Sequence, residues 1–129
     1  MLARLGGDPV GRVYLWYEAA EEPEIRRHLP GVPLILDLWV RAPWRGAGIG
    51  TALVGEAERV LRQRDADRVA LAVQPANEGA LRLYRRLGYR HWAHPDIVTT
   101  ARWYRPDGRY VSYPERCRVL VKRVSPAVW

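Results

Sequence analysis

Three glycines within five residues, Gly46, Gly48 and Gly50, form the segment whose spacing most directly suggests chemistry. They stand between an apolar stretch and the start of a helical pattern. Glycine lets the backbone approach a ligand closely, and the unpaired N–H groups at a helix start attract phosphate oxygens. Arg45 adds a positive charge. The segment predicts a phosphate site, although the glycines also suit a plain strand-to-helix turn.

Two nucleotide-binding motifs do not fit this segment. A P-loop needs a lysine after its last glycine, and the single lysine of the chain is Lys122. A dinucleotide fingerprint needs its third glycine where Thr51 stands, and an acidic residue after the next strand, where Gln74 stands. Neither nucleotide fold is expected.

A second pair of polar side chains follows on a predicted helix. Asn77 and Tyr84 are seven residues apart, which is two helical turns, so both project from one face together with Ala80. Such a face can line a cleft, in which a phenol can act as a general acid. The alternative is that Asn77 only caps the helix and Tyr84 only packs in the core.

The elements that must position these residues follow from periodicity and turn residues. We expect strands at 2–5, 10–17, 34–40, 68–73, 89–92 and 116–124, helices at about 49–64 and 77–87, a surface loop at 18–33 with at most a helical turn at 24–28, and a turn at 106–108. The connection from 34–40 through a helix to 68–73 implies that these two strands are parallel.

The composition indicates one folded domain, residues 1–129. Hydrophobic residues make up 48% and charged residues 27% of the chain. No apolar run has the length of a membrane span or a signal peptide, so we expect a cytoplasmic protein without a membrane partner. The single cysteine, Cys117, excludes an internal disulfide. The net charge of +7 favours an anionic ligand.

Two stretches in a fixed order resemble the GNAT superfamily of N-acetyltransferases. The first is Leu38-Trp39-Val40 followed by the R-x-x-G-x-G pattern of Arg45, Gly48 and Gly50; the second is Asn77, Ala80, Tyr84 and Leu87-Gly88-Tyr89. The close match covers residues 34–92. With the residue patterns, this resemblance implies a single α/β (α+β) domain. Its sheet is mixed and mostly antiparallel, with helices on both faces, and strand 34–40 splays from its parallel neighbour.

The resemblance also implies a ligand and residue roles. Acetyl-CoA is the acyl donor, and no metal is required. Loop amides bind its pyrophosphate, namely those around Arg45, Gly46, Ala47, Gly48, Gly50 and Thr51. The backbone of Leu38 and Val40 pairs with pantetheine, and the Leu38 amide also polarises the thioester carbonyl. Asn77 hydrogen-bonds the pantetheine arm, and Tyr84 protonates the leaving thiolate.

Two features depart from the family pattern. Many relatives carry a glutamate on the strand that matches 34–40, where the inward positions here are Leu34 and Leu36, and alternation turns Asp37 to the other face. Candidate bases are Asp37, Glu21, Glu22, His28, His91 and His94, and none is assigned. The usual opening strand and helices have no counterpart before Leu2, which is expected of a minimal member, of a truncated start or of a fold that a partner chain completes. An open sheet edge and apolar face left in this way would favour a homodimer.

The expected reaction is direct acetyl transfer to a primary amine of a small molecule or peptide. One alternative is a domain that binds acyl-CoA without catalysis. Another is a nucleic-acid module, because residues 99–113 interleave arginines with Trp103 and tyrosines. We favour a half-buried hairpin for that segment and expect no nucleic-acid partner. Cys117 is expected to be a core residue rather than a nucleophile.

Overall fold

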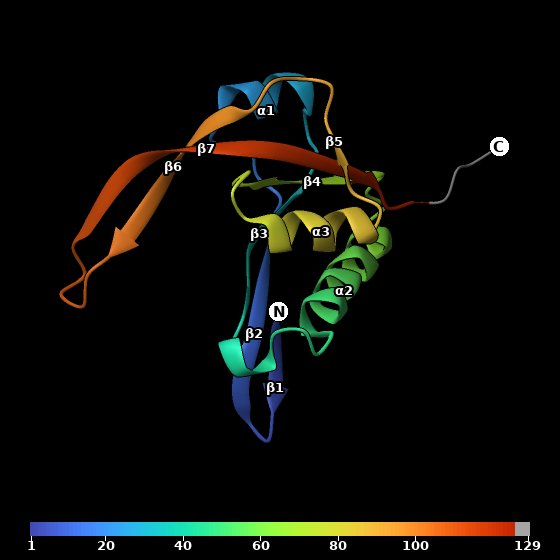
Figure 1. Cartoon of the computed structure of the whole chain (residues 1–129). Helices are drawn as coiled ribbons and strands as arrows, with labels where there is room; N and C mark the ends of the chain where they lie inside the picture. The colour runs from blue at the N-terminus through green and yellow to red at the C-terminus, as the bar shows by residue number, and fades with distance from the viewer. Residues whose placement is uncertain (126–129) are drawn as a thin grey trace.

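Seven strands and three helices make up the fold in the computed structural model, which describes residues 1–125 (Figure 1). The strands are β1 (Leu2–Leu5), β2 (Asp8–Trp16), β3 (Leu34–Val40), β4 (Arg68–Val73), β5 (Arg90–His91), β6 (Ile97–Tyr104) and β7 (Tyr110–Arg123). The helices are α1 (Pro23–His28), α2 (Ile49–Gln63) and α3 (Glu78–Arg86), with a 3-10 turn at Ala42–Trp44. The sheet order is β1-β2-β3-β4-β7-β5, and β6 pairs with β7 outside this path.

Strands β3 and β4 are parallel and pair only at one end. Their register contains a single Cα pair, Leu34 with Ala70, and the Ala70 N–H donates to the Pro33 carbonyl at 3.0 Å. All other strand pairs are antiparallel. The mixed sheet with a splayed parallel pair is therefore confirmed, and the splay leaves an opening near the middle of the sheet.

Each face of the sheet carries its own core, because strand side chains alternate between the faces. On one face, α2 and α3 pack against residues such as Val13, Ile35 and Leu120. On the other, Ile25 and Leu29 pack against Leu34, Ala70 and Val119. Helices thus cover both faces, as expected. The segment 18–33 is more than a surface loop, because α1 supplies part of the second core.

The β6–β7 hairpin extends away from the body of the molecule (Figure 1). Its turn lies where it was expected, with Gly108 at a φ of 85° and the Asp107 carboxylate accepting a hydrogen bond from the Arg109 amide at 2.9 Å. The expectation that the last strand begins at residue 116 is wrong. Strand β7 begins at Tyr110, because residues 110–115 pair with β6 instead of forming a loop.

A buried carboxylate ties α2 to the sheet. Glu58 is 7% exposed and accepts hydrogen bonds from the Tyr89 hydroxyl at 2.9 Å and from Lys122 Nζ at 2.8 Å. Burial and the neighbouring Glu58 raise the pKa of Tyr89, so the phenol stays a donor. These bonds fix the end of α3, where Tyr89 follows Gly88, against α2 and β7.

Within residues 1–125, no helix is both long enough and apolar enough to cross a membrane.

Candidate functional site

The glycine segment lies where β3 gives way to α2. Gly46 and Gly48 have φ values of 81° and 85°, which other residues adopt only with strain. Gly50 has no positive φ, and a Cβ there would make an ordinary contact with the Leu83 side chain at 3.4 Å. Backbone demands thus explain Gly46 and Gly48, whereas neither the backbone nor the packing requires glycine at position 50.

The same backbone leaves a group of amides unpaired. The Ala52 N–H closes the first turn of α2 on the Gly48 carbonyl at 3.0 Å. Among the described residues, no backbone carbonyl accepts from the N–H groups of Gly46, Gly48, Ile49, Gly50 and Thr51. Unpaired N–H groups at the start of a fifteen-residue helix form an anion site.

These amides border a cavity of about 830 Å³ between β3, α2 and α3, here called the basic cavity. Its charged lining consists of Arg45, Arg82 and Arg86, and no carboxylate takes part. The cavity therefore combines three guanidinium groups with a helix start, which suits a ligand that carries several phosphates.

The basic cavity brings together most of the residues predicted to hold the cofactor. Its lining includes Leu38, Val40, Arg45, Gly46, Gly48, Gly50, Thr51 and Asn77. Ala47 lies outside the lining, and its N–H donates to the Trp44 carbonyl at 3.3 Å. Arg45 Nε donates to the Val40 carbonyl at 3.0 Å, which fixes the Arg45 side chain against the end of β3. The arginines of α3, Arg82 and Arg86, were missed, because basic residues on an exposed helix face resemble ordinary surface charge.

A smaller cavity of about 230 Å³, here called the neck, fills the splay between β3 and β4. It shares Leu38, Asn77 and Ala80 with the basic cavity. Its other lining residues include Asp37, Tyr84, Glu115 and Cys117. The neck thus reaches from the predicted cofactor site to the centre of the sheet.

Tyr84 lines the neck from α3. Its side chain is 4% exposed, and its ring lies edge-on to Tyr89 with centroids 5.4 Å apart. Burial raises the pKa of Tyr84 to about 12, so the phenol is neutral and keeps its proton at neutral pH. Within the described part of the chain, no hydrogen bond engages its hydroxyl, which leaves the proton free for a ligand in the neck.

Asn77 both caps α3 and lines the cavities. Its Oδ1 accepts a hydrogen bond from the Ala80 N–H at 3.2 Å and so caps α3. The residue also lines the basic cavity and the neck. Because the cap uses only the oxygen, the Asn77 amide nitrogen remains available as a donor to a ligand.

A bulge in β3 changes the position of Asp37. The β2–β3 register shifts between Arg12, opposite Trp39, and Tyr14, opposite Leu36, and Asp37 has a φ of 53°. Strict alternation placed Asp37 on the face opposite Leu34 and Leu36, and this expectation is wrong. The extra residue breaks the alternation, so Asp37 lines the same cavity as those two leucines and also the neck.

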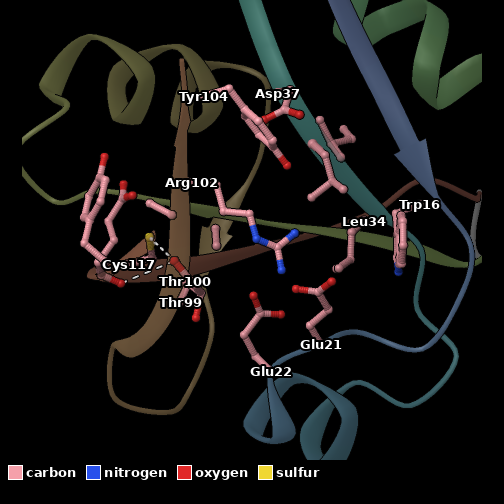
Figure 2. Close-up of a pocket in the computed structure, with 16 residues that line it drawn as sticks. Trp16, Glu21, Glu22, Leu34, Asp37, Thr99, Thr100, Arg102, Tyr104 and Cys117 are labelled. Carbon is pink, nitrogen blue, oxygen red and sulfur yellow. Dashed lines mark hydrogen bonds between the residues drawn. The ribbon is translucent and has the colours of Figure 1, made fainter. Parts of the chain in front are cut away.

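That further cavity, of about 550 Å³, lies between the loop before α1, strand β3 and the β6–β7 hairpin, and is here called the acidic cavity (Figure 2). Its charged lining consists of Glu21, Glu22, Asp37, Glu115 and Arg102. It shares Asp37, Glu115 and Cys117 with the neck. Each cavity therefore shares lining residues with the next, and together the three cavities extend through the splay from a basic end to an acidic end.

The candidate bases separate into two groups. Asp37, Glu21 and Glu22 line the acidic cavity. The three histidines line none of these cavities: His28 stacks on His94 with ring centroids 3.5 Å apart, and His91 lies 3.8 Å from Asp96. Glu115 lines both the acidic cavity and the neck and was missed, because β7 was not expected to extend so far toward the hairpin.

Two other expectations concern residues at this site. Burial raises the pKa of the Cys117 thiol, and the residue is 5% exposed, which agrees with a core role rather than a nucleophile. Residues 99–113 do form a hairpin, but Trp103 is 59% exposed, so the hairpin is less buried than expected. Arg102 and Tyr104 from this hairpin line the acidic cavity, which does not suit a nucleic-acid phosphate.

Known proteins with similar sequences are acetyltransferases. A family model described as the acetyltransferase (GNAT) family matches residues 1–89. An uncharacterised N-acetyltransferase of Methanocaldococcus jannaschii is 33% identical over 91 residues, which cover 68% of this chain and 37% of the relative. A mycothiol acetyltransferase of Salinispora tropica is 35% identical over 92 residues, which cover 69% of this chain and 29% of the relative. The matched region is thus well under half of either relative.

Solved structures show the same fold. YncA of Salmonella typhimurium, solved with its cofactor acetyl-CoA, superposes with a TM-score of 0.67 at 12% identity, over 99% of this chain and 65% of YncA.

Proposed function

The chain belongs to the GNAT acetyltransferase family, and we propose that it transfers an acetyl group from acetyl-CoA to a primary amine in a ternary complex. The observation that carries this proposal is the continuity of the three cavities through the splay of β3 and β4. A donor in the basic cavity and an acceptor in the acidic cavity would meet at the neck.

In this proposal the donor lies along the basic cavity. The pyrophosphate is held by the cations that line the cavity and by the unpaired amides of Gly46, Gly48, Ile49, Gly50 and Thr51. The backbone of Leu38 and Val40 pairs with pantetheine, and the Asn77 amide nitrogen donates to it. The thioester then lies in the neck, where the Leu38 amide polarises its carbonyl.

The transfer step forms one bond and breaks another. The neutral amine nitrogen attacks the thioester carbon, the carbon–sulfur bond breaks, and the nitrogen loses a proton. Asp37 and Glu115 line both the neck and the acidic cavity and are the carboxylates positioned to accept that proton, directly or through water. Tyr84 donates its hydroxyl proton or hydrogen bond to the departing thiolate.

The direct test is turnover. Purified protein is incubated with acetyl-CoA and a panel of primary amines, and the free CoA thiol and the acetylated amine are both measured. Matching amounts of the two products support the proposed transfer. Binding of acetyl-CoA without either product across the panel would instead support an acyl-CoA-binding domain without catalysis.

A further inference from the structure

On the basis of the proposed acetyl transfer, we infer that the acidic cavity takes an acceptor amine with a second positive charge, such as a diamine or polyamine. Four carboxylates and one guanidinium line this cavity. The chain as a whole has a net charge of +7, and the basic cavity has no carboxylate in its lining. The charge of the acidic cavity is thus opposite in sign to the net charge of the chain.

The carboxylates of the acidic cavity are also unpaired. Of the ten other acidic residues, five have a cationic partner within 4.0 Å, among them Glu58, Glu78 and Asp96. Among the described residues, no ion pair or side-chain hydrogen bond engages the carboxylates of Glu21, Glu22, Asp37 and Glu115. In a chain with 21 lysines and arginines, four neighbouring carboxylates without a partner leave a site that attracts an external cation.

The carboxylates occupy two levels of the cavity. Asp37 and Glu115 line the neck as well, next to the site proposed for the thioester. Glu21 and Glu22 line only the acidic cavity and come from the loop before α1. An acceptor with two ammonium groups can therefore present one at the neck and place the other near Glu21 and Glu22.

The remaining lining suits the hydrocarbon part of such an acceptor. Trp16, Tyr104 and Tyr113 bring aromatic rings, and Leu34 and Leu36 bring aliphatic side chains. Aromatic faces attract alkylammonium groups, and apolar side chains pack against methylenes. A lining of carboxylates and rings is the chemistry that recognises a linear amine.

Arg102 shows where a cation can be held. In Figure 2 its guanidinium reaches from β6 into the cavity, and the Glu21 and Glu22 carboxylates point toward it. It forms no ion pair within 4.0 Å with either in the described structure. A second ammonium of the acceptor would compete with this guanidinium, so Arg102→Gln should improve the KM of a diamine.

The test compares three amines of equal carbon number: putrescine, butylamine and γ-aminobutyrate, which end in a cation, a methyl group and a carboxylate. We expect the KM of putrescine to be about tenfold below that of butylamine, and γ-aminobutyrate to be the poorest acceptor. In the double variant Glu21→Gln, Glu22→Gln, the KM of putrescine should rise by about tenfold while that of butylamine stays unchanged. Glu24→Gln is the matched control, because Glu24 belongs to the same segment but does not line the cavity.

Calorimetric titrations separate this inference from the proposed transfer. Putrescine binding to the wild type that weakens in the double variant, but not in Glu24→Gln, supports the inference even if no acetyl group is transferred. If acetyl-CoA binds and amines are acetylated, yet γ-aminobutyrate equals putrescine or the double variant behaves as Glu24→Gln does, the inference is overturned and the proposed function remains.

Discussion

Asp37 on β3 and Tyr84 on α3 line the same neck between β3 and β4, although 47 positions separate them in the sequence. The bulge at Asp37 brings a carboxylate to this neck, and the buried face of α3 brings a phenol that keeps its proton. A proton acceptor and a proton donor therefore meet at the junction of the basic and acidic cavities. This arrangement is what an amine attack on a thioester needs.

Replacing Tyr84 by Phe removes the hydroxyl and keeps the ring that packs against Tyr89. We expect kcat to fall by roughly tenfold to a hundredfold, because the thiolate then leaves without its donor, while the affinity for acetyl-CoA changes little. Steady-state kinetics and calorimetry measure the two quantities. An unchanged kcat would remove Tyr84 from the mechanism.

The raised pKa of Tyr84 makes a prediction about alkaline pH. The donor is the neutral phenol, which is present below its pKa and lost above it, and burial moves that pKa to about 12. The ratio of wild-type kcat to that of Tyr84→Phe should therefore stay constant from about pH 7 to about pH 10. A ratio that falls in this range would show that the phenol ionises at an ordinary pKa.

Two neighbouring arginines of α3 offer a matched pair. Arg86 lines the basic cavity and Arg85 does not. We expect Arg86→Ala to weaken acetyl-CoA binding by roughly fivefold, and more at low salt, because an exposed guanidinium contributes a screened attraction to phosphate. Arg85→Ala should bind as the wild type does. Equal affinities for the two variants in calorimetry at low salt would argue against phosphate contacts from this helix.

The buried Glu58 network predicts a loss of stability. Glu58 is 7% exposed. In Lys122→Met its carboxylate keeps the hydrogen bond from the Tyr89 hydroxyl, and the nearest remaining cation is Arg62, 3.9 Å away. We expect the free energy of unfolding to fall by about 2 kcal/mol, because the charge loses its closest partner. Chemical denaturation measures this, with Arg123→Met as the control at an exposed neighbouring position. A Lys122→Met protein as stable as the control would mean that the ion pair contributes little.

Much of this fold could be predicted because the local signals agree with the tertiary packing. The apolar run 34–40, the helical period after Gly48 and the stop at Gly88 all correspond to observed elements. The cofactor side was predictable for the same reason, since a glycine segment between a strand and a helix leaves amides unpaired wherever it occurs.

The acceptor side was less predictable because it depends on long-range pairing. The alternation of side chains between the two faces of β3 fails at Asp37, because the pairing of β3 with β2 contains a bulge there. Glu115 enters the cavity because β7 continues to Tyr110 and pairs with β6, although Pro114 beside it is unfavourable within a strand. Glu58 had a helical signal, since it lies beside buried Val54, Ala57 and Leu61, but its partners come from distant segments.

In the proposed function, the start of α2 binds the pyrophosphate of acetyl-CoA. Thr51→Glu is the most informative variant, because Thr51 lies in the first turn, lines the basic cavity and carries no positive φ. A glutamate there favours the helix electrostatically and repels phosphate. A substitution at Gly48, with its φ of 85°, would also strain the backbone. Gly55→Glu, on the same helix and outside the cavity lining, is the control.

The measurement to make first is a calorimetric titration of the wild type and both glutamate variants with acetyl-CoA. We expect saturable binding by the wild type and by Gly55→Glu, and an affinity at least about tenfold weaker for Thr51→Glu. Equal affinity in Thr51→Glu, or no binding by the folded wild type, would contradict this expectation.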